Sequence, residues 1–178
     1  IAKLERDNEL NYEPNEILVS GGAKQSIYNM LQALLSSGDE ALIPAPYWVS
    51  YPDMVRLADA DPVILHTKAS DDYLISAQQL KSAINENTRL LILNAPSNPT
   101  GMGYGREQLR ALGEVLLEFP RVMICSDDIY EHIWWGDEPF CNIAQVVPEL
   151  KDRMVLVNGV SKAYAMTGWR IGYAAGPA

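Results

Sequence analysis

The chain has 178 residues, of which 48% are hydrophobic and 21% are charged, and its formal net charge at pH 7 is −9. This composition is typical of a globular domain with a substantial core and argues against a disordered chain. The excess of acidic residues disfavours nucleic acid and anionic membranes as partners, because both require basic patches. A small phosphorylated ligand is not excluded, since a local pocket can hold an anion in an acidic protein.

The cysteines and the ends of the sequence indicate its setting. Cys125 and Cys141 show neither metal-ligand spacing nor a disulfide framework, which favours a reducing, cytoplasmic location. No apolar run approaches the length of a membrane span. The residues Ile1 to Glu9 resemble the end of a helix, and the sequence stops soon after a strand-like run. We therefore expect a fragment of a longer protein.

Seven short apolar runs, rich in branched residues and bounded by polar or turn residues, have the character of buried strands. They are Ile17–Val19, Ala41–Ile43, Val63–Leu65, Leu90–Leu93, Val122–Cys125, Met154–Val157 and Ile171–Ala175. Helical spacing of apolar residues lies between most of them, for example within Ile27–Leu35 and within Arg106–Glu118. Ser76 and Gln79 form a capping-box pattern. This alternation predicts an α/β fold of three layers, with helices on both faces of a mostly parallel sheet.

Ligands of such sheets bind at the carboxyl ends of the strands, so the residues after each run are the candidates for a site. Gly21 and Gly22 open a helix and allow backbone N–H groups to approach an anion. Trp48 follows the second run and can stack on a planar ring, and Asn98 lies in a proline-rich loop with an amide to donate. Each signal is weak alone, because a tight turn, a core aromatic residue and a plain loop are simpler explanations.

Two acidic residues follow the run Val122–Cys125. An aspartate at the end of an apolar strand is costly to desolvate unless it is paired. Asp127 is placed to face a cationic ring nitrogen, and Tyr130 is placed to donate to a phenolate oxygen. We expect Asp128 to be only a helix cap.

Lys162 follows the run Met154–Val157, and Arg170 comes eight positions later in a stretch without acidic residues. We expect desolvation at the strand end to lower the pKa of Lys162, giving a nucleophilic amine that can form a Schiff base. For a lone lysine, a side chain that reaches solvent is the simpler explanation. Taken together, however, the anion loop, aromatic, amide, aspartate, tyrosine, lysine and arginine fit a planar, phosphorylated, basic aldehyde, pyridoxal phosphate.

Five segments carry a resemblance to a known family. SGGAKQ, APYWVSYPDM, APSNPTG, SDDIYEHI and GVSKAYAMTGWRIGY resemble the class I/II aminotransferases, which are pyridoxal-phosphate enzymes of fold type I. The set looks most like the bacterial aspartate aminotransferases, and it spans nearly the whole chain in the family's order. The resemblance implies that residues 1–178 form the large cofactor-binding domain with a seven-stranded sheet. It also implies that an amino-terminal segment and a carboxyl-terminal small domain lie outside this chain.

The resemblance implies roles around the cofactor ring. Lys162 matches the lysine that forms the Schiff base and shuttles the proton. Asp127 matches the carboxylate that keeps the pyridine nitrogen protonated. Tyr130 and Asn98 match the residues that hydrogen-bond the 3′-oxygen, and Trp48 matches the aromatic residue stacked on the ring.

The resemblance also implies a phosphate site. Ala23 and Lys24 match positions whose backbone N–H groups bind the phosphate, Gly22 makes the turn before them, and Arg170 matches the phosphate-binding arginine. We assign no separate role to the Lys24 ammonium.

One position departs from the family pattern. Many relatives carry serine three positions before the lysine, where it binds phosphate, and this chain has Gly159 there. Ser161 is a weak candidate to compensate.

The implied reaction moves an amino group between an amino acid, aspartate, and a 2-oxo acid, 2-oxoglutarate, in a homodimeric enzyme. Other enzymes of the same fold type stay open: alanine, aromatic or prephenate aminotransferases and carbon–sulfur β-lyases. A non-catalytic cofactor-binding fragment is a further alternative. A nucleotide-binding Rossmann domain is a distant one, because the glycines after Asn98 do not join a strand directly to a helix.

Overall fold

The computed structural model describes all 178 residues and contains one seven-stranded sheet in the order β1-β7-β6-β5-β4-β2-β3. Every predicted apolar run forms a strand: β1 Ile17–Ser20, β2 Glu40–Ala45, β3 Asp61–His66, β4 Thr88–Asn94, β5 Met123–Asp127, β6 Met154–Gly159 and β7 Gly172–Ala175. Neighbouring strands are parallel, except that β7 is antiparallel to both β1 and β6. The predicted mostly parallel seven-stranded sheet is therefore confirmed, with six strands running one way.

The helices also follow the predicted pattern. They are α1 Ala2–Asn8, α2 Ala23–Leu34, α3 Ser50–Arg56, α4 Ala77–Ala83, α5 Arg106–Glu118 and α6 Ile143–Val146, with short 3₁₀ turns at Pro14–Glu16, Ala69–Asp71, Pro148–Arg153 and Thr167–Trp169. Ser76 caps α4 by accepting a hydrogen bond from the Gln79 backbone N–H at 3.1 Å. The Gln79 side chain donates instead to the carbonyl of His66, so the reciprocal half of the capping box does not form. None of these helices combines the length and the apolar character that a membrane crossing needs.

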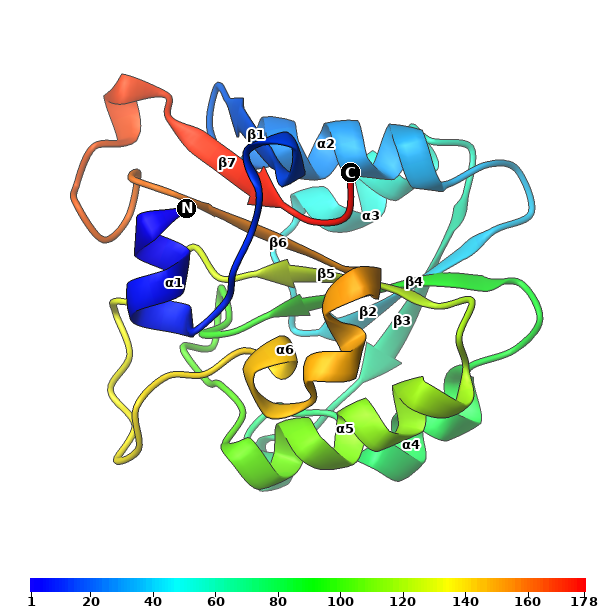
Figure 1. Cartoon of the computed structure of the whole chain (residues 1–178). Helices are drawn as coiled ribbons and strands as arrows, with labels where there is room; N and C mark the ends of the chain where they lie inside the picture. The colour runs from blue at the N-terminus through cyan, green and yellow to red at the C-terminus, as the bar shows by residue number, and fades with distance from the viewer.

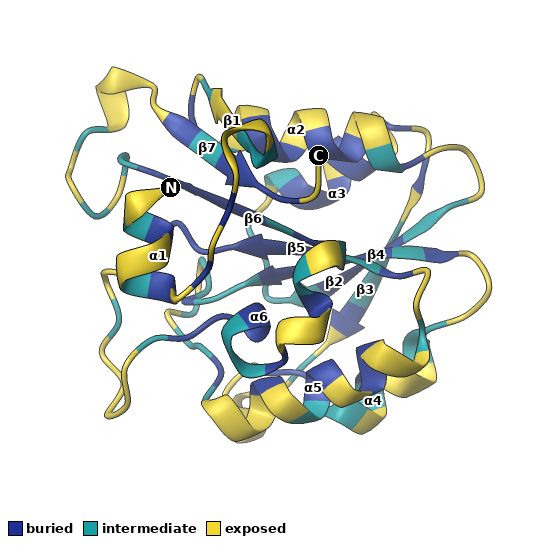
Figure 2. Ribbon diagram, in the orientation of Figure 1, coloured by how far each residue is buried: buried dark blue, intermediate teal, exposed yellow.

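Helices cover both faces of the sheet, as Figure 1 shows. The strand β4 illustrates why, since successive side chains of a strand point to opposite faces. Leu91 packs into a core of 25 buried residues shared with α4, α5 and α6. Ile92 packs into a second core of 16 buried residues shared with α2 and α3. The central strands are therefore buried from both sides (Figure 2), and the three-layer architecture is confirmed.

The topology brings the candidate site residues to one edge of the sheet. The strands β1, β2, β4, β5 and β6 all end at this edge, and β7 begins there. The segment that carries Lys162 and Arg170 joins the end of β6 to the start of β7.

Candidate active site

A cavity of about 290 Å³ opens at this edge of the sheet. Nine of the ten residues predicted to bind a cofactor line it: Ala23, Lys24, Trp48, Asn98, Asp127, Tyr130, Ser161, Lys162 and Arg170. They come from five separate loops or strand ends that are far apart in the sequence. The fold therefore brings residues that are distant in the sequence into one cavity.

Gly22, the remaining predicted residue, lies at the N-cap of α2 rather than in the cavity lining. Its φ of 104° is unfavourable for other residues, and a Cβ there would overlap the guanidinium of Arg170. Arg170 donates to the carbonyls of Gly21 at 3.0 Å and Thr167 at 2.9 Å, which hold the guanidinium against the start of the helix. The first N–H groups of a helix have no partner within it, so this corner presents unsatisfied donors beside a cation. The arrangement is suited to an anion such as a phosphate.

Asp127 ends β5 and is only 4% exposed. It accepts a hydrogen bond from the hydroxyl of Tyr51 at 2.5 Å and a long one from the backbone N–H of Ile129 at 3.4 Å. Burial raises the pKa of the Asp127 carboxyl to about 6, and the two hydrogen bonds oppose that rise. Both donors are neutral, so the protein supplies no cation for this buried carboxylate.

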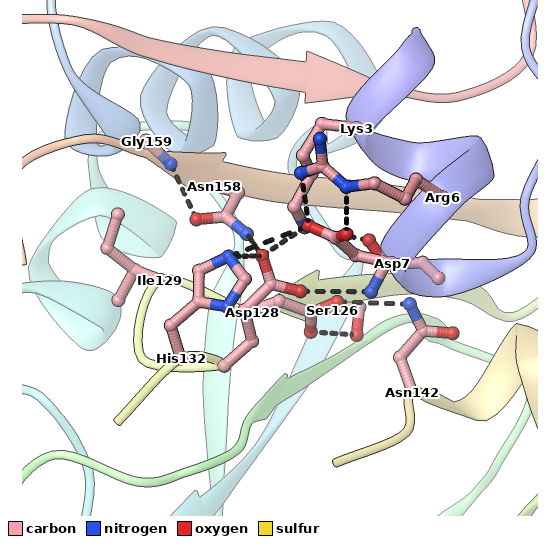
Figure 3. Close-up of polar contacts among 12 residues, drawn as sticks. Lys3, Arg6, Asp7, Ser126, Asp128, Ile129, His132, Asn142, Asn158 and Gly159 are labelled. Atoms are coloured by element: carbon pink, nitrogen blue, oxygen red, sulfur yellow. Dashed lines mark hydrogen bonds and ion pairs between the residues drawn. The ribbon is translucent and has the colours of Figure 1, made fainter. Parts of the chain in front are cut away.

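Asp128 does not cap a helix, and our expectation for it was wrong. The residues that follow it form turns, and its carboxylate is buried between Ser126, whose hydroxyl donates at 2.7 Å, and Asn142, whose amide donates at 3.1 Å. These three side chains lie together in Figure 3. Burial, with a smaller effect from Glu131, raises the pKa of Asp128 to about 8. Asp128 therefore points away from the cavity and ties the loop after β5 to the segment before α6.

Lys162 is an exposed residue, which contradicts the expectation that the strand end desolvates its amine. Its Nζ lies 5.6 Å from the centroid of the Tyr130 ring, and the Nζ of Lys24 lies 4.8 Å from the centroid of the Trp48 ring. Neither lysine forms an ion pair with a carboxylate, and neither does Arg170. Three cationic side chains thus face the cavity without an acidic partner.

The cavity lining includes residues that the sequence analysis did not single out, among them Tyr51, Asn94 and Thr167. Asn94 donates to the carbonyl of Asp127 at 3.0 Å and accepts from the backbone N–H of Asn98 at 2.8 Å, so it fixes the relative position of two site residues. As the last residue of β4, it could have been found by inspecting strand ends. Tyr51 carries only the weak signal of lying three positions after Trp48, and their rings meet edge to face at 5.3 Å.

The charges of the cavity are divided between two places. Arg170 and the start of α2 lie at the β7 side, whereas Asp127 ends β5, two strands away in the sheet. Because neighbouring strands are about 4.8 Å apart, these places are separated by roughly 10 Å. A ligand with an anionic group at one end and a protonated ring nitrogen at the other complements both, so the residues present fit pyridoxal phosphate.

Comparisons with known proteins agree with this geometry. The family described as aminotransferase class I and II matches residues 1–178. An aspartate/prephenate aminotransferase of Nitrosomonas europaea is 52% identical over 178 residues, which are 100% of this chain and 45% of that protein. A bifunctional aspartate aminotransferase and glutamate/aspartate-prephenate aminotransferase of Petunia hybrida is 54% identical over 98% of this chain and 36% of its own length.

Solved structures share the same architecture. An aspartate aminotransferase from Rhizobium meliloti matches 98% of this chain and 44% of its own with a TM-score of 0.96 and 50% identity. An aromatic aminotransferase from Pyrococcus horikoshii matches 99% of this chain and 47% of its own with a TM-score of 0.94 and 37% identity. The chain thus spans less than half the length of these relatives, yet all of it lies within one conserved architecture. The chain belongs to the aminotransferase class I and II family.

Proposed function

We propose that the protein containing this chain is a pyridoxal-phosphate-dependent aminotransferase that moves an amino group between aspartate and a 2-oxo acid such as 2-oxoglutarate. The observation that carries this proposal is the divided charge of the cavity, with the Arg170 guanidinium and the start of α2 at one side and a buried carboxylate without a cation at the other. We assign residues 1–178 to the cofactor-binding domain, because the predicted cofactor contacts gather within them.

The cavity residues divide into those that would hold the phosphate and those that would hold the ring. Arg170 and the backbone N–H groups of Ala23 and Lys24 would bind the phosphate, with charge-assisted hydrogen bonds from the guanidinium. Ser161 lines the same cavity, and its hydroxyl would be a further donor to the phosphate. Its backbone carbonyl accepts a hydrogen bond from the Thr167 hydroxyl at 2.9 Å.

The ring would lie over the end of β5. Trp48 provides an aromatic face, Asp127 would hold a proton on the ring nitrogen, and Tyr130 and Asn98 would donate to the 3′-oxygen. Lys162 would hold the cofactor covalently through its Nζ.

When bound, pyridoxal phosphate supplies an electron sink for the charge that develops at the substrate Cα. The residues of this chain supply proton transfer and orientation around it. The Nζ of Lys162 would be the base that takes the substrate Cα proton and later returns it. Asp127 would stabilise a positive charge at the ring nitrogen, because a buried carboxylate interacts strongly with a nearby cation. Because Lys162 is exposed, its side chain has room to move as it takes and returns the proton.

The choice of substrates rests on the relatives. Relatives from Nitrosomonas europaea and Petunia hybrida carry both aspartate and prephenate in their names, so prephenate is a second candidate 2-oxo acid. The homodimer implied by the family resemblance stays a prediction.

A spectral titration tests the proposal. The full-length protein should gain a visible absorption band on addition of pyridoxal 5′-phosphate, lose it on addition of aspartate, and regain it with 2-oxoglutarate or prephenate. Alanine and an aromatic amino acid serve as competing donors in parallel titrations. A band that responds to no amino acid would reject the aminotransferase and favour a cofactor-binding role only.

A further inference from the structure

A second group of charged and polar side chains lies beside the cavity, on the other side of the segment that follows β6. Its centre is Glu131, whose side chain is 4% exposed. The carboxylate accepts hydrogen bonds from three donors: the ammonium of Lys3, the amide of Asn8 at 2.9 Å and the amide of Asn158 at 2.6 Å. Two of the donors belong to α1 and the third to β6, so one buried carboxylate joins elements that are distant in the sequence.

The cluster has a fixed direction of hydrogen bonding. Asn8 accepts from the ammonium of Lys3 at 2.7 Å through its Oδ1, so its amide nitrogen must face Glu131. Asn158 accepts from the backbone N–H of Gly159 at 2.7 Å through its Oδ1, so its amide nitrogen must face Glu131 as well. Neither amide can be turned over without placing two donors or two acceptors together. Only an acceptor at position 131 completes both arms.

The Asn158 arm ends on the backbone that leads to Lys162. Gly159 is the last residue of β6, and its N–H is held by Asn158, as Figure 3 shows. On its other side Gly159 packs against the backbone at the start of β7, where a Cβ would lie 2.8 Å from the carbonyl oxygen of Ile171, the residue just before the strand. The next residue, Val160, donates to the same carbonyl at 3.2 Å. The point at which the Lys162 segment leaves the sheet is therefore held between β7 and the Glu131 cluster.

Glu131 also follows Tyr130 in the chain, so it connects the loop that carries Tyr130 with the segment that carries Lys162. We propose that Glu131 is a positioning residue that, anchored by Lys3 and Asn8 of α1, holds Asn158 and thereby sets the backbone of the Lys162 segment. This proposal rests on the proposed function, which makes Lys162 the reacting lysine. The Lys3 ammonium offsets the charge of the buried carboxylate, which would otherwise be costly to bury.

The geometry makes α1 part of the active-site support. A carboxylate with three donors is rigid, because each donor restricts it from a different direction, and α1 supplies two of them. Removing the acceptor leaves Asn158 free to rotate and releases the Gly159 N–H. Lys162 then samples more positions relative to the cavity, although nothing in the cavity itself has changed.

Hydrogen exchange in the full-length protein without added cofactor tests the proposal. In Glu131→Ala, no acceptor remains for the amide of Asn158, so exchange of the peptide covering residues 159–162 should accelerate about ten-fold. Asn158→Ala removes only the arm to Gly159 and leaves the Lys3–Glu131 pair, and it should show the same local acceleration with less loss of stability. Leu116→Ala, a core change on α5 that touches neither cluster nor cavity, is the matched control for general destabilisation.

A conservative variant separates positioning from general stability. Lys3 and Asn158 both donate to the Oε1 of Glu131, so the side-chain oxygen of Glu131→Gln can accept from both, and its amide nitrogen then opposes only that of Asn8. Exchange at residues 159–162 should therefore stay slower in Glu131→Gln than in Glu131→Ala, although both variants lose the charge that pairs with Lys3. After loading with pyridoxal 5′-phosphate, the rate of borohydride trapping at Lys162 should be lowest in Glu131→Ala. Unchanged local exchange in Glu131→Ala, or equal acceleration in Glu131→Gln and Glu131→Ala, would overturn the proposal. Failure of the proposed function would appear differently, as absence of any Lys162 adduct in the unaltered protein.

Discussion

Two groups of charged side chains lie on either side of the segment that follows β6, and they differ in how their charges are balanced. In the cluster around Glu131, a carboxylate meets an ammonium and two amides, and every charge has a partner from the protein. In the cavity, Lys24, Lys162 and Arg170 have no acidic partner, and Asp127 has only neutral donors. The two groups share one short piece of backbone, at Gly159.

The difference separates structural charges from ligand-binding ones. A buried charge that the protein itself balances contributes to positioning, because its partners are always present. A charge without a protein partner is tolerated in a cavity where a ligand supplies the opposite charge. Carboxyl groups with shifted pKa values are found at such sites. Neighbouring Asp127 and Asp128 both have only neutral donors, but they differ in position: Asp127 lines the cavity, whereas Asp128 is enclosed by Ser126 and Asn142 and points away from it.

The largest expected effect comes from Lys162, whose amine has no acidic partner. Lys162→Ala removes the group that bonds the cofactor and transfers the proton, so turnover should fall below detection and the visible band should not form. Absorption spectra and steady-state rates measure both outcomes. Lys151→Ala is the control, because that ammonium lies near Glu16 and away from the cavity. A normal visible band in Lys162→Ala would contradict the assignment.

The next largest effect is expected at Asp127, and its neighbour Asp128 serves as the comparison. Asp127→Asn should lower turnover by about 10²–10³-fold, because it removes a preorganised charge from the ring nitrogen. The visible band should still form. Asp128→Asn, a change outside the cavity lining, should keep turnover within a few-fold of the unaltered enzyme. Equal losses in the two variants would contradict the assignment of Asp127, rather than Asp128, to the ring nitrogen.

Tyr51→Phe should give a smaller effect that is visible in pH dependence. The Tyr51 hydroxyl donates to Asp127 and holds the pKa of that carboxyl down against burial. Burial already raises this pKa above the ordinary value of aspartate, so ionising Asp127 costs stability in the folded protein, and the Tyr51 hydrogen bond reduces that cost. Loss of the hydroxyl raises the pKa further and increases the cost at a pH where the carboxyl is ionised. The unfolding free energy above pH 6 should fall by about 2 kcal/mol. Denaturant titrations at pH 5 and pH 8 measure this, and a loss that is the same at both would count against it.

The smallest expected effect on cofactor binding lies where the two groups share backbone. Gly159→Ser should destabilise the protein by about 1–3 kcal/mol, because its Cβ would lie 2.8 Å from the Ile171 carbonyl oxygen. Although the family resemblance implies serine as the usual residue at this position, we expect no gain in cofactor affinity here. Thermal unfolding and a cofactor titration of the same variant measure the two quantities. A stable variant that binds the cofactor more tightly would show that β7 can move away.

Much of this architecture could be predicted from the sequence, because apolar runs and helical spacing report burial directly. The run Val122–Cys125 marked β5, and the strand-end rule led from it to Asp127. The antiparallel β7 could not be read in this way, since a short apolar run carries no direction. The Asp128 prediction failed because turns, rather than a helix, follow β5.

The parts of the site that were missed depend on contacts between distant segments. Tyr51 reaches Asp127 from α3 across 76 positions of sequence, and Lys3 reaches Glu131 across 128. No local pattern records such a pairing. The exposure of Lys162 was missed for the same reason, because it depends on how the segment after β6 leaves the sheet.

The central claim is that the unbalanced amine at Lys162 is the one that bonds the cofactor, and Lys24 in the same cavity is its natural competitor. Borohydride reduction of the full-length protein loaded with pyridoxal 5′-phosphate, followed by peptide mass spectrometry, tests this directly. The account predicts one cofactor-derived mass, on the peptide that contains Lys162. A stable adduct on Lys24, or none on either lysine, would contradict it.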